Sequence, residues 1–181
     1  DMPQFITDND FMTRWVHMAN RPLEKHLQQT LVKEMKAKLQ GKSQQEQVQQ
    51  ILWWMHGSVD LECQTPNQES FLYAYDEDVW GYDRPFYAEE TLFYPYCDTE
   101  DRSILMSRLV RDVVGLDVVF IYYPGHTAIG VCFTDEYVKG EFVVKDGRYY
   151  VICDPTYLGS LVGEEMPNTV GLEKTIAPLK R

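Results

Sequence analysis

An α+β fold is predicted for this chain, with helices in its N-terminal part and an antiparallel sheet in its C-terminal part. Apolar residues recur at helical spacing up to about residue 57 and again over 99–114. After residue 117 they come in short runs, and two of these runs flank Asp146-Gly147, a strong hairpin signal. Helices first and hairpin-connected strands afterwards are typical of an α+β fold.

Two helices are expected before residue 58. The first begins near Asn20 and Pro22, ends at Gly41, and has one apolar face, as has the second, which begins after Ser43. Ser43 and Glu46 have the spacing of a capping box. The two apolar faces are formed by Leu23, Leu27, Leu31, Met35 and Leu39, and by Val48, Ile51, Leu52 and Met55.

Residues 58–96 show no sustained period and are rich in Tyr, Phe, Trp, Asp and Pro. A stretch of this length without regular elements often has a binding function. A well-packed aromatic loop that covers the core is the equally weighted alternative.

A third helix is expected from about Thr99 to Val114. Asp98 or Thr99 can cap its start, and Gly115 ends it. Its apolar stripe is so wide that the helix should be buried on most sides. Four strands should follow, over 118–123, 128–133, 141–145 and 148–153, and no clear element is expected after Leu158.

The bulk composition restricts the classes of partner. The chain has 181 residues, 44% of them hydrophobic, and a formal net charge of −11. An acidic surface repels nucleic acid and anionic membranes, so we expect neither as a partner. No apolar run is long enough for a membrane span. Because no Met precedes Asp1, the sequence can be part of a longer chain.

The four cysteines lie at 63, 97, 132 and 153, without a C-x-x-C pair, which argues against a structural zinc site. Two disulfides would be possible in an oxidising compartment. However, Cys132 and Cys153 lie in apolar strand patterns, where a cysteine behaves as a small hydrophobe. We therefore expect four free thiols.

Cys97, His126 and Asp154 together have the residue types of a thiol-based acyl-transfer site. Cys97 lies in a polar turn just before the third helix, where the positive helix end would favour a thiolate. His126 opens one predicted strand and can shuttle protons, while Asp154 closes another and can orient the imidazole. Alone, each has a structural alternative, and it is their order along the chain that favours catalysis.

Other candidates carry less weight. A zinc site of the same three residues lacks supporting spacing, so no metal and no cofactor is expected. The remaining histidines, His17, His26 and His56, are interpreted as solvated or interfacial. An oxyanion needs hydrogen-bond donors, and the Cys97 backbone N–H is one. The candidates for a second donor or a substrate contact are Trp53, Trp54, Gln64 and Trp80.

These segments resemble the transglutaminase-like superfamily, a papain-like cysteine hydrolase group, in its bacterial type. The matching segments are 96–103, 125–128 and 150–156, the last ending in Asp154-Pro155-Thr156, and the resemblance covers about 43–158. It implies that a central helix carrying Cys97 packs on an antiparallel sheet. Residues 1–42 would then be a helical extension and 43–181 the catalytic domain, unless 1–181 is one domain.

The resemblance also implies an activity, a cysteine-dependent peptidase, amidase or acyl transferase. No calcium motif is visible, and nothing indicates an amine-acceptor site, so hydrolysis is favoured over cross-linking of a peptide or protein substrate. A bacterial cell envelope is favoured over the cytoplasm. The alternative function is a catalytically silent module that binds a peptide or glycan through the aromatic segment 58–96.

Overall fold

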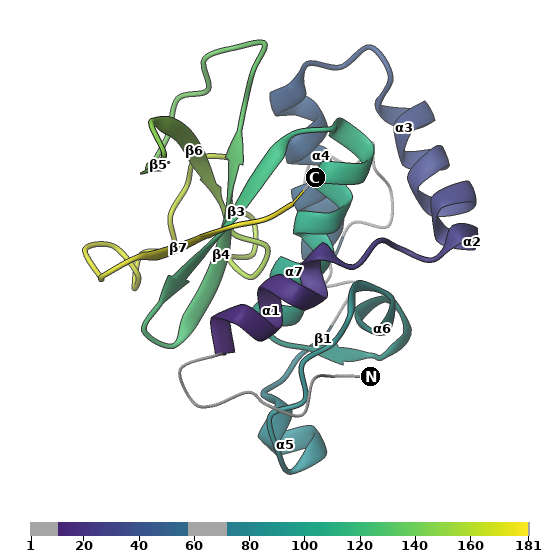
Figure 1. The fold of residues 1–181 in the computed structure, drawn as a ribbon, viewed down its shortest axis with the longest axis vertical. Helices are drawn as coiled ribbons and strands as arrows, with labels where there is room; N and C mark the ends of the chain where they lie inside the picture. The colour runs from purple at the N-terminus through teal and green to yellow at the C-terminus, as the bar shows by residue number, and fades with distance from the viewer. Residues whose placement is uncertain (1–10, 58–71, 181) are drawn as a thin grey trace.

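The computed structural model describes residues 11–57 and 72–180. A five-stranded antiparallel sheet lies beside a long helix, α7 (Thr99–Leu109), and the N-terminal helices pack around the other sides of that helix (Figure 1). This arrangement confirms the α+β class predicted from the sequence.

The N-terminal helices are α1 (Phe11–Asn20), a helical segment over Lys25–Leu39, and α4 (Gln44–His56). The middle segment consists of α2 (Lys25–Leu27), a π-helical turn η2 (Gln28–Val32) and α3 (Lys33–Leu39). The predicted capping box of α4 is confirmed, since Ser43 and Glu46 each accept a hydrogen bond from the other's backbone N–H.

Helix α1 was not predicted, and Asn20 ends it instead of marking the start of the next helix. The side chain of Asn20 explains the error. Its Oδ1 accepts hydrogen bonds from Arg111 and from the backbone N–H of Lys180. Its position along the chain suggests a helix cap, but in the fold Asn20 connects the end of α1 to Arg111 and to the C-terminal segment at Lys180.

Short elements occupy the described part of the aperiodic segment, residues 72–96. They are β1 (Leu72–Tyr73), α5 (Asp76–Trp80), α6 (Ala88–Phe93) and β2 (Tyr96–Cys97), and β1 pairs with β2 in parallel. Elements of two to six residues are too short to show a period, so the expectation of no regular structure is wrong here. Residues 58–71 lie outside the described ranges.

Helix α7 begins and ends as predicted. The side chain of Asp98 accepts from the backbone N–H groups of Glu100 and Asp101. The helix continues into a π-helical turn, η3 (Val110–Val114), and Gly115 ends it at φ 80°, a left-handed conformation that glycine adopts without strain. All residues from Thr99 to Leu109 except Glu100 are buried, which confirms the expectation of a helix enclosed on most sides.

The sheet has the order β5-β6-β4-β3-β7, and every neighbouring pair is antiparallel. The expectation of no element after Leu158 is wrong, because β7 pairs with β3 at the sheet edge. Strand β7 ends in a proline, a residue tolerated at an edge, and shows no buried side chain that would signal a strand. The strands are β3 (Asp117–Tyr123), β4 (His126–Cys132), β5 (Phe142–Lys145), β6 (Arg148–Cys153) and β7 (Thr175–Pro178).

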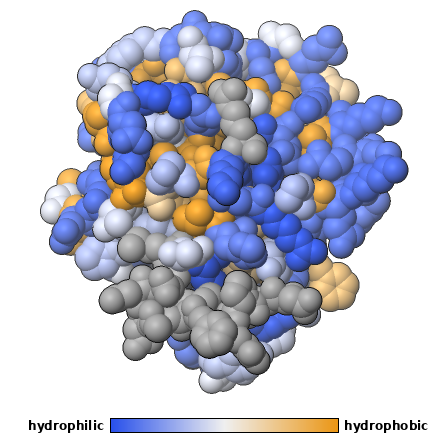
Figure 2. Space-filling view, viewed as in Figure 1, coloured by the Kyte–Doolittle hydropathy of each residue, from blue (hydrophilic) through white to orange (hydrophobic). Residues whose placement is uncertain are grey.

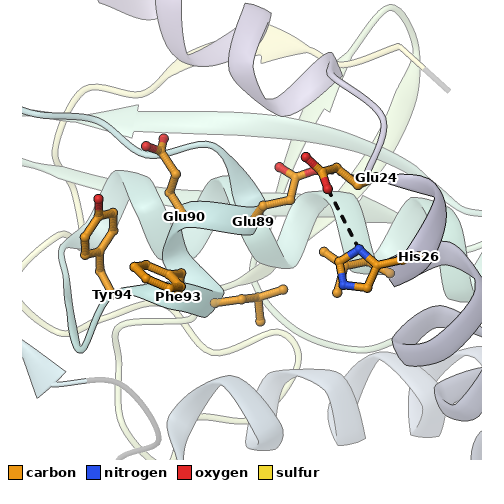
Figure 3. Close-up of a pocket in the computed structure, with 8 residues that line it drawn as sticks. Glu24, His26, Glu89, Glu90, Phe93 and Tyr94 are labelled. Atoms are coloured by element: carbon orange, nitrogen blue, oxygen red, sulfur yellow. Dashed lines mark hydrogen bonds and ion pairs between the residues drawn. The ribbon is translucent and has the colours of Figure 1, made fainter.

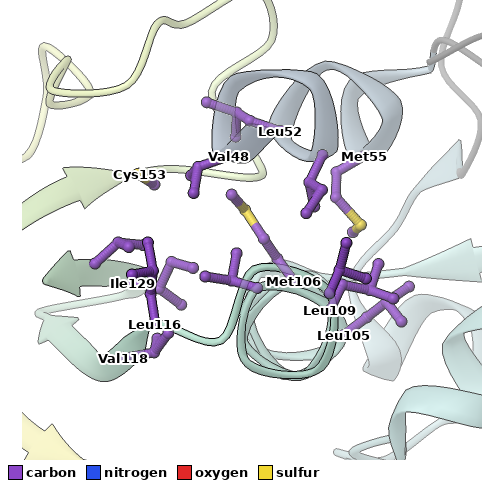
Figure 4. Packing of buried hydrophobic residues seen from close by; sticks show 14 of the residues in the cluster. Val48, Leu52, Met55, Leu105, Met106, Leu109, Leu116, Val118, Ile129 and Cys153 are labelled. Carbon is purple, nitrogen blue, oxygen red and sulfur yellow. The ribbon is translucent and has the colours of Figure 1, made fainter. Parts of the chain in front are cut away.

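The main core lies between α7 and the sheet, and α4 closes it from the other side (Figure 4). Met18, Leu23 and Met35 belong to the same buried cluster as Ile104 and Leu105. The core therefore crosses residue 42 without a break. Arg111 strengthens this connection, since its buried guanidinium donates to the backbone oxygens of Ala19 and Lys180.

Hydrophilic residues cover most of the side of the molecule formed by α2 and α3 (Figure 2). Among the described residues, no helix combines the length and the apolar character needed to cross a membrane.

Candidate active site

His126 and Asp154 are brought into direct contact by neighbouring strands. His126 begins β4, and Asp154 directly follows β6, which pairs with β4. The imidazole Nε2 lies 2.7 Å from Asp154 Oδ2, and both side chains are buried. A carboxylate only accepts hydrogen bonds, so this contact assigns the proton to Nε2 and leaves Nδ1 for another partner.

The Asp154 carboxylate is held on its other side by backbone groups. Its Oδ1 accepts from the N–H of Thr156 at 2.9 Å and from that of Tyr157 at 3.1 Å. Asp154 therefore forms a turn, as a residue before proline often does. The turn role does not replace the contact with His126, because each role uses a different oxygen.

His56, the last residue of α4, contacts the backbone of the same segment. It is fully buried, and its Nε2 lies 3.1 Å from the backbone oxygen of Asp154. The interpretation of His56 as solvated or interfacial is therefore wrong, whereas His17 and His26 are exposed as expected. Helical periodicity places His56 beside the apolar stripe, and only the tertiary structure shows that β6 ends against it.

Cys97 lies at the end of α7 that faces His126. Two hydrogen bonds join the first turns of α7 to the start of β4: Ser103 Oγ donates to the Thr127 carbonyl at 3.1 Å, and Thr127 Oγ1 donates to Glu100 Oε1 at 3.0 Å. Cys97 immediately precedes the cap of this helix, and His126 immediately precedes Thr127. Among the described residues, however, no hydrogen bond joins the Cys97 sulfur to His126.

Cys97 is 1% exposed, and its sulfur accepts a hydrogen bond from Arg102 Nε at 3.4 Å. Burial raises the pKa of the Cys97 thiol to about 11; Arg102 opposes this rise, and Asp101 and Asp98 add to it. The expectation that the helix start stabilises a thiolate is therefore wrong for this conformation. Asp98 occupies the free N–H groups of that helix start, so they are not available to the sulfur.

Three carboxylates gather beside Cys97. Asp76, Asp98 and Asp101 place oxygens within 4.8 Å of one another, which is close enough to hold a cation. Burial raises the pKa of Asp98 to about 9 and that of Asp101 to about 8. Backbone N–H groups already occupy these carboxylates. Arg84 donates to one oxygen of Asp76, and the first turn of α7 donates to one oxygen of Asp98. Both oxygens of Asp101 accept, one from Phe86 and the other from Asp98.

The four candidates for an oxyanion donor or substrate contact lie in different places. Trp53, on α4, lines a surface pocket of about 250 Å³ together with Lys42 and Gln45. Trp54 packs against the main core. Trp80 packs edge-on against Phe86 and Tyr94. None of the described contacts of Trp53 or Trp80 reaches Cys97, and Gln64 lies outside the described residues.

The remaining described cysteines are structural. Cys132 and Cys153 are free and buried, as is Cys97, which agrees with the expectation of free thiols; Cys63 lies outside the described residues. Burial raises the pKa of Cys153, so it is no rival nucleophile.

Arg102 is the residue at this site that the sequence reasoning missed. It is among the largest fully buried side chains of the molecule. The signal was present, because an arginine inside a helix expected to be buried on most sides needs an anionic or polar partner.

A second concave feature lies between the N-terminal helices and α6 (Figure 3). This pocket of about 420 Å³ is mostly apolar, with the strongly exposed ring of Phe93 at its side and an ion pair between His26 and Glu24 at its other end. Its lining residues are Glu24, His26, Leu27, Glu89, Glu90, Leu92, Phe93 and Tyr94.

Comparison of the chain with models of protein families and with curated proteins gives no match. The functional argument therefore depends on the geometry of the site.

Proposed function

We propose that the protein is a cysteine-dependent enzyme of transglutaminase-like type that cleaves or transfers the acyl group of an amide bond in a peptide or protein. The observation that carries this proposal is the 2.7 Å contact between His126 and Asp154, at the start of the strand that packs against the Cys97 end of α7. A carboxylate that fixes a histidine beside a cysteine is the arrangement that activates a thiol.

In the proposed reaction, His126 Nδ1 takes the proton of the Cys97 thiol as the sulfur attacks the amide carbonyl. Asp154 stabilises the imidazolium that forms. The imidazolium then protonates the leaving amine, and the acyl-enzyme on Cys97 is resolved by water or by a second amine. Hydrolysis is favoured over transfer, because no feature of the described residues indicates a site for an acceptor amine.

The buried state of Cys97 sets a requirement for this mechanism. A sulfur that is 1% exposed cannot meet a substrate without movement of the groups around it. Catalytic hydrogen bonds are often formed only in the substrate complex, so their absence in the free enzyme does not argue against a triad. The proposal therefore requires that substrate binding moves Cys97 toward His126.

Profiling against peptide libraries, with Cys97→Ala as control, tests the proposal. We expect amide turnover by the wild type and none by the variant. Turnover that survives in Cys97→Ala would exclude Cys97 as the nucleophile.

A catalytically silent binding module is the second candidate, and the enclosure of Cys97 with its raised pKa favours it. The pocket beside Phe93 and Tyr94 would then be the binding surface for a peptide or glycan (Figure 3). Labelling with iodoacetamide in the presence of library peptides separates the two candidates. In an enzyme, a peptide substrate should acylate Cys97 and so slow its labelling relative to Cys63, whereas a peptide bound to a silent module should leave the ratio of the two rates unchanged.

A further inference from the structure

We infer that Arg102 is the positive partner of the Cys97 thiolate, a catalytic contact that neither the helix start nor His126 makes in this conformation. The inference deepens the proposed function and rests on it, since it names the group that favours the ionised form of the buried Cys97 against the effect of burial.

The geometry aims the guanidinium at the sulfur. Arg102 is 1% exposed, and its Nε–H donates to Cys97 Sγ at 3.4 Å. The guanidinium also lies over the ring of Tyr73, 5.7 Å from the centroid. Tyr73 is the register partner of Cys97 in the β1–β2 pair, so the two contacts hold the guanidinium against the strand pair that carries the sulfur.

Arginine suits this role because it stays protonated when buried, unlike lysine or histidine. A buried charge is stable only beside a compensating charge or hydrogen-bond partners. A thiolate at Cys97 adds a compensating charge to the partners that Arg102 already has, and the attraction between the two charges is far stronger in a low-dielectric place than in water.

The other charged groups around the sulfur oppose its ionisation. These groups are Asp98 and Asp101, which come from the start of α7 and raise the pKa of Cys97, and Asp76 from α5 lies within 4.8 Å of both. Tyr73 pairs with Cys97 from β1, and burial raises the pKa of the Tyr73 phenol, so this group stays neutral. Among the described contacts of Cys97, Arg102 is the positively charged group, and it acts against these carboxylates.

The proton and charge balance of the step is complete. The thiol proton passes to His126 Nδ1, and the sulfur becomes an anion that keeps the Arg102 Nε–H bond. When the S–C bond to the acyl carbon forms, the negative charge moves to the carbonyl oxygen and the bond to Arg102 weakens. The carbonyl then re-forms as the C–N bond breaks, and the amine leaves with the proton of the His126 imidazolium. Hydrolysis of the acyl-enzyme restores the thiol and the original contact. Arg102 gives up no proton at any point.

The rate of Cys97 alkylation by iodoacetamide between pH 6 and 10, mapped by mass spectrometry on the full chain, tests the inference. Arg102→Gln should slow labelling of Cys97 at least about tenfold at pH 8, since one pKa unit is a factor of ten in thiolate fraction. Arg102→Lys, which keeps the charge without the planar guanidinium, should lie between this variant and the wild type.

Two further variants separate charge from packing. Asp98→Asn keeps a good helix cap and removes a carboxyl that ionises above about pH 9, so labelling of Cys97 near pH 10 should become faster. Arg108→Gln removes another buried arginine of α7, one paired with Asp112, and should leave Cys97 labelling at the wild-type rate. A structure that merely loosened would expose the sulfur and speed labelling in both Arg102→Gln and Asp98→Asn.

Opposite changes in these two variants support the inference. Equal or faster labelling of Cys97 in Arg102→Gln overturns it, as does labelling in Arg102→Lys that is slower than in Arg102→Gln. If Arg102→Gln does not fold, as its circular dichroism spectrum would show, the Arg102→Lys and Asp98→Asn rates decide. Failure of the proposed function is distinct, because it appears as absence of Cys97-dependent turnover in the wild type.

Discussion

The two halves of the candidate site differ in how far they are assembled. On the sheet, His126 contacts Asp154 Oδ2. The other carboxylate oxygen of Asp154 accepts from Thr156, and its backbone oxygen contacts His56. At the helix start, the sulfur of Cys97 is enclosed and bonded to Arg102 instead of His126. The sheet half is assembled, and the helix half is closed.

The difference follows from what each half is built on. Neighbouring antiparallel strands fix the positions of their residues through a ladder of hydrogen bonds. His126 at the start of β4 and Asp154 at the end of β6 are therefore held in contact with little freedom. The helix half depends on two-residue strands and a helix cap. Groups held by so few backbone hydrogen bonds are the ones that open first.

The largest expected effect comes from a substitution that removes the carboxylate partner of His126 in the sheet half. Asp154→Asn removes the charge that stabilises the imidazolium, so we expect turnover of an amide substrate to fall by about three to four orders of magnitude. Steady-state kinetics on a substrate found by peptide profiling would measure it. A loss of less than tenfold would show that Asp154 only builds the turn with Thr156 and Tyr157.

The second prediction concerns the pH dependence of the helix half. Because the pKa of Cys97 is raised to about 11, its labelling in the substrate-free protein should keep rising up to about pH 11 instead of levelling off near 9. The folded state then holds a proton that the unfolded state has lost between about pH 9 and 11, so this residue makes stability fall as the pH rises.

Labelling rates in steps of half a pH unit, with Cys97→Ala to identify the peptide, would give the midpoint. A midpoint below 8 would contradict the closed state described for this half.

The third prediction tests how tightly the sheet half is packed. A Cβ added to Gly130 of β4 would lie 2.8 Å from Tyr150 Cβ and 2.9 Å from Val119 Cγ2. Such overpacking costs about 1–3 kcal/mol, so Gly130→Ala should lower the free energy of unfolding by that amount in urea titrations. An unchanged midpoint would show that the strands can move apart, and that the sheet half is less fixed than its hydrogen bonds suggest.

The smallest expected effect concerns Asp76, whose carboxyl lies beside the start of α7 in the helix half. Burial raises the pKa of Asp76 to about 6, so between about pH 4 and 6 its carboxyl is protonated in the folded protein and ionised in the unfolded chain. Wild-type stability from this group is present below about pH 4 and is lost as the pH rises through 6, whereas Asn does not titrate.

Asp76→Asn should therefore gain a few degrees in melting temperature relative to the wild type between pH 4 and 7. A difference that stays constant with pH would mean that Asp76 is ionised throughout.

Much of the fold could be predicted because it depends on local patterns. The Ser43 capping box, the Gly115 helix end and the Asp146-Gly147 hairpin are signals within a few residues of each other, and all three are confirmed. The elements that were missed have no such signal. Strand β7 is defined by its pairing with β3, and β1 by its pairing with β2.

The sequence by itself determined that helices precede an antiparallel sheet, and that a cysteine, a histidine and an aspartate lie at a helix start and two strand ends. Only the tertiary structure decided what surrounds each of them. Ionisation depends on desolvation and on charges that lie close in space, and these come from elements far apart in the chain. For this reason Asp98 occupies the helix N–H groups and Arg102 contacts the sulfur, although the sequence pattern had predicted the helix start and His126 as the partners of Cys97.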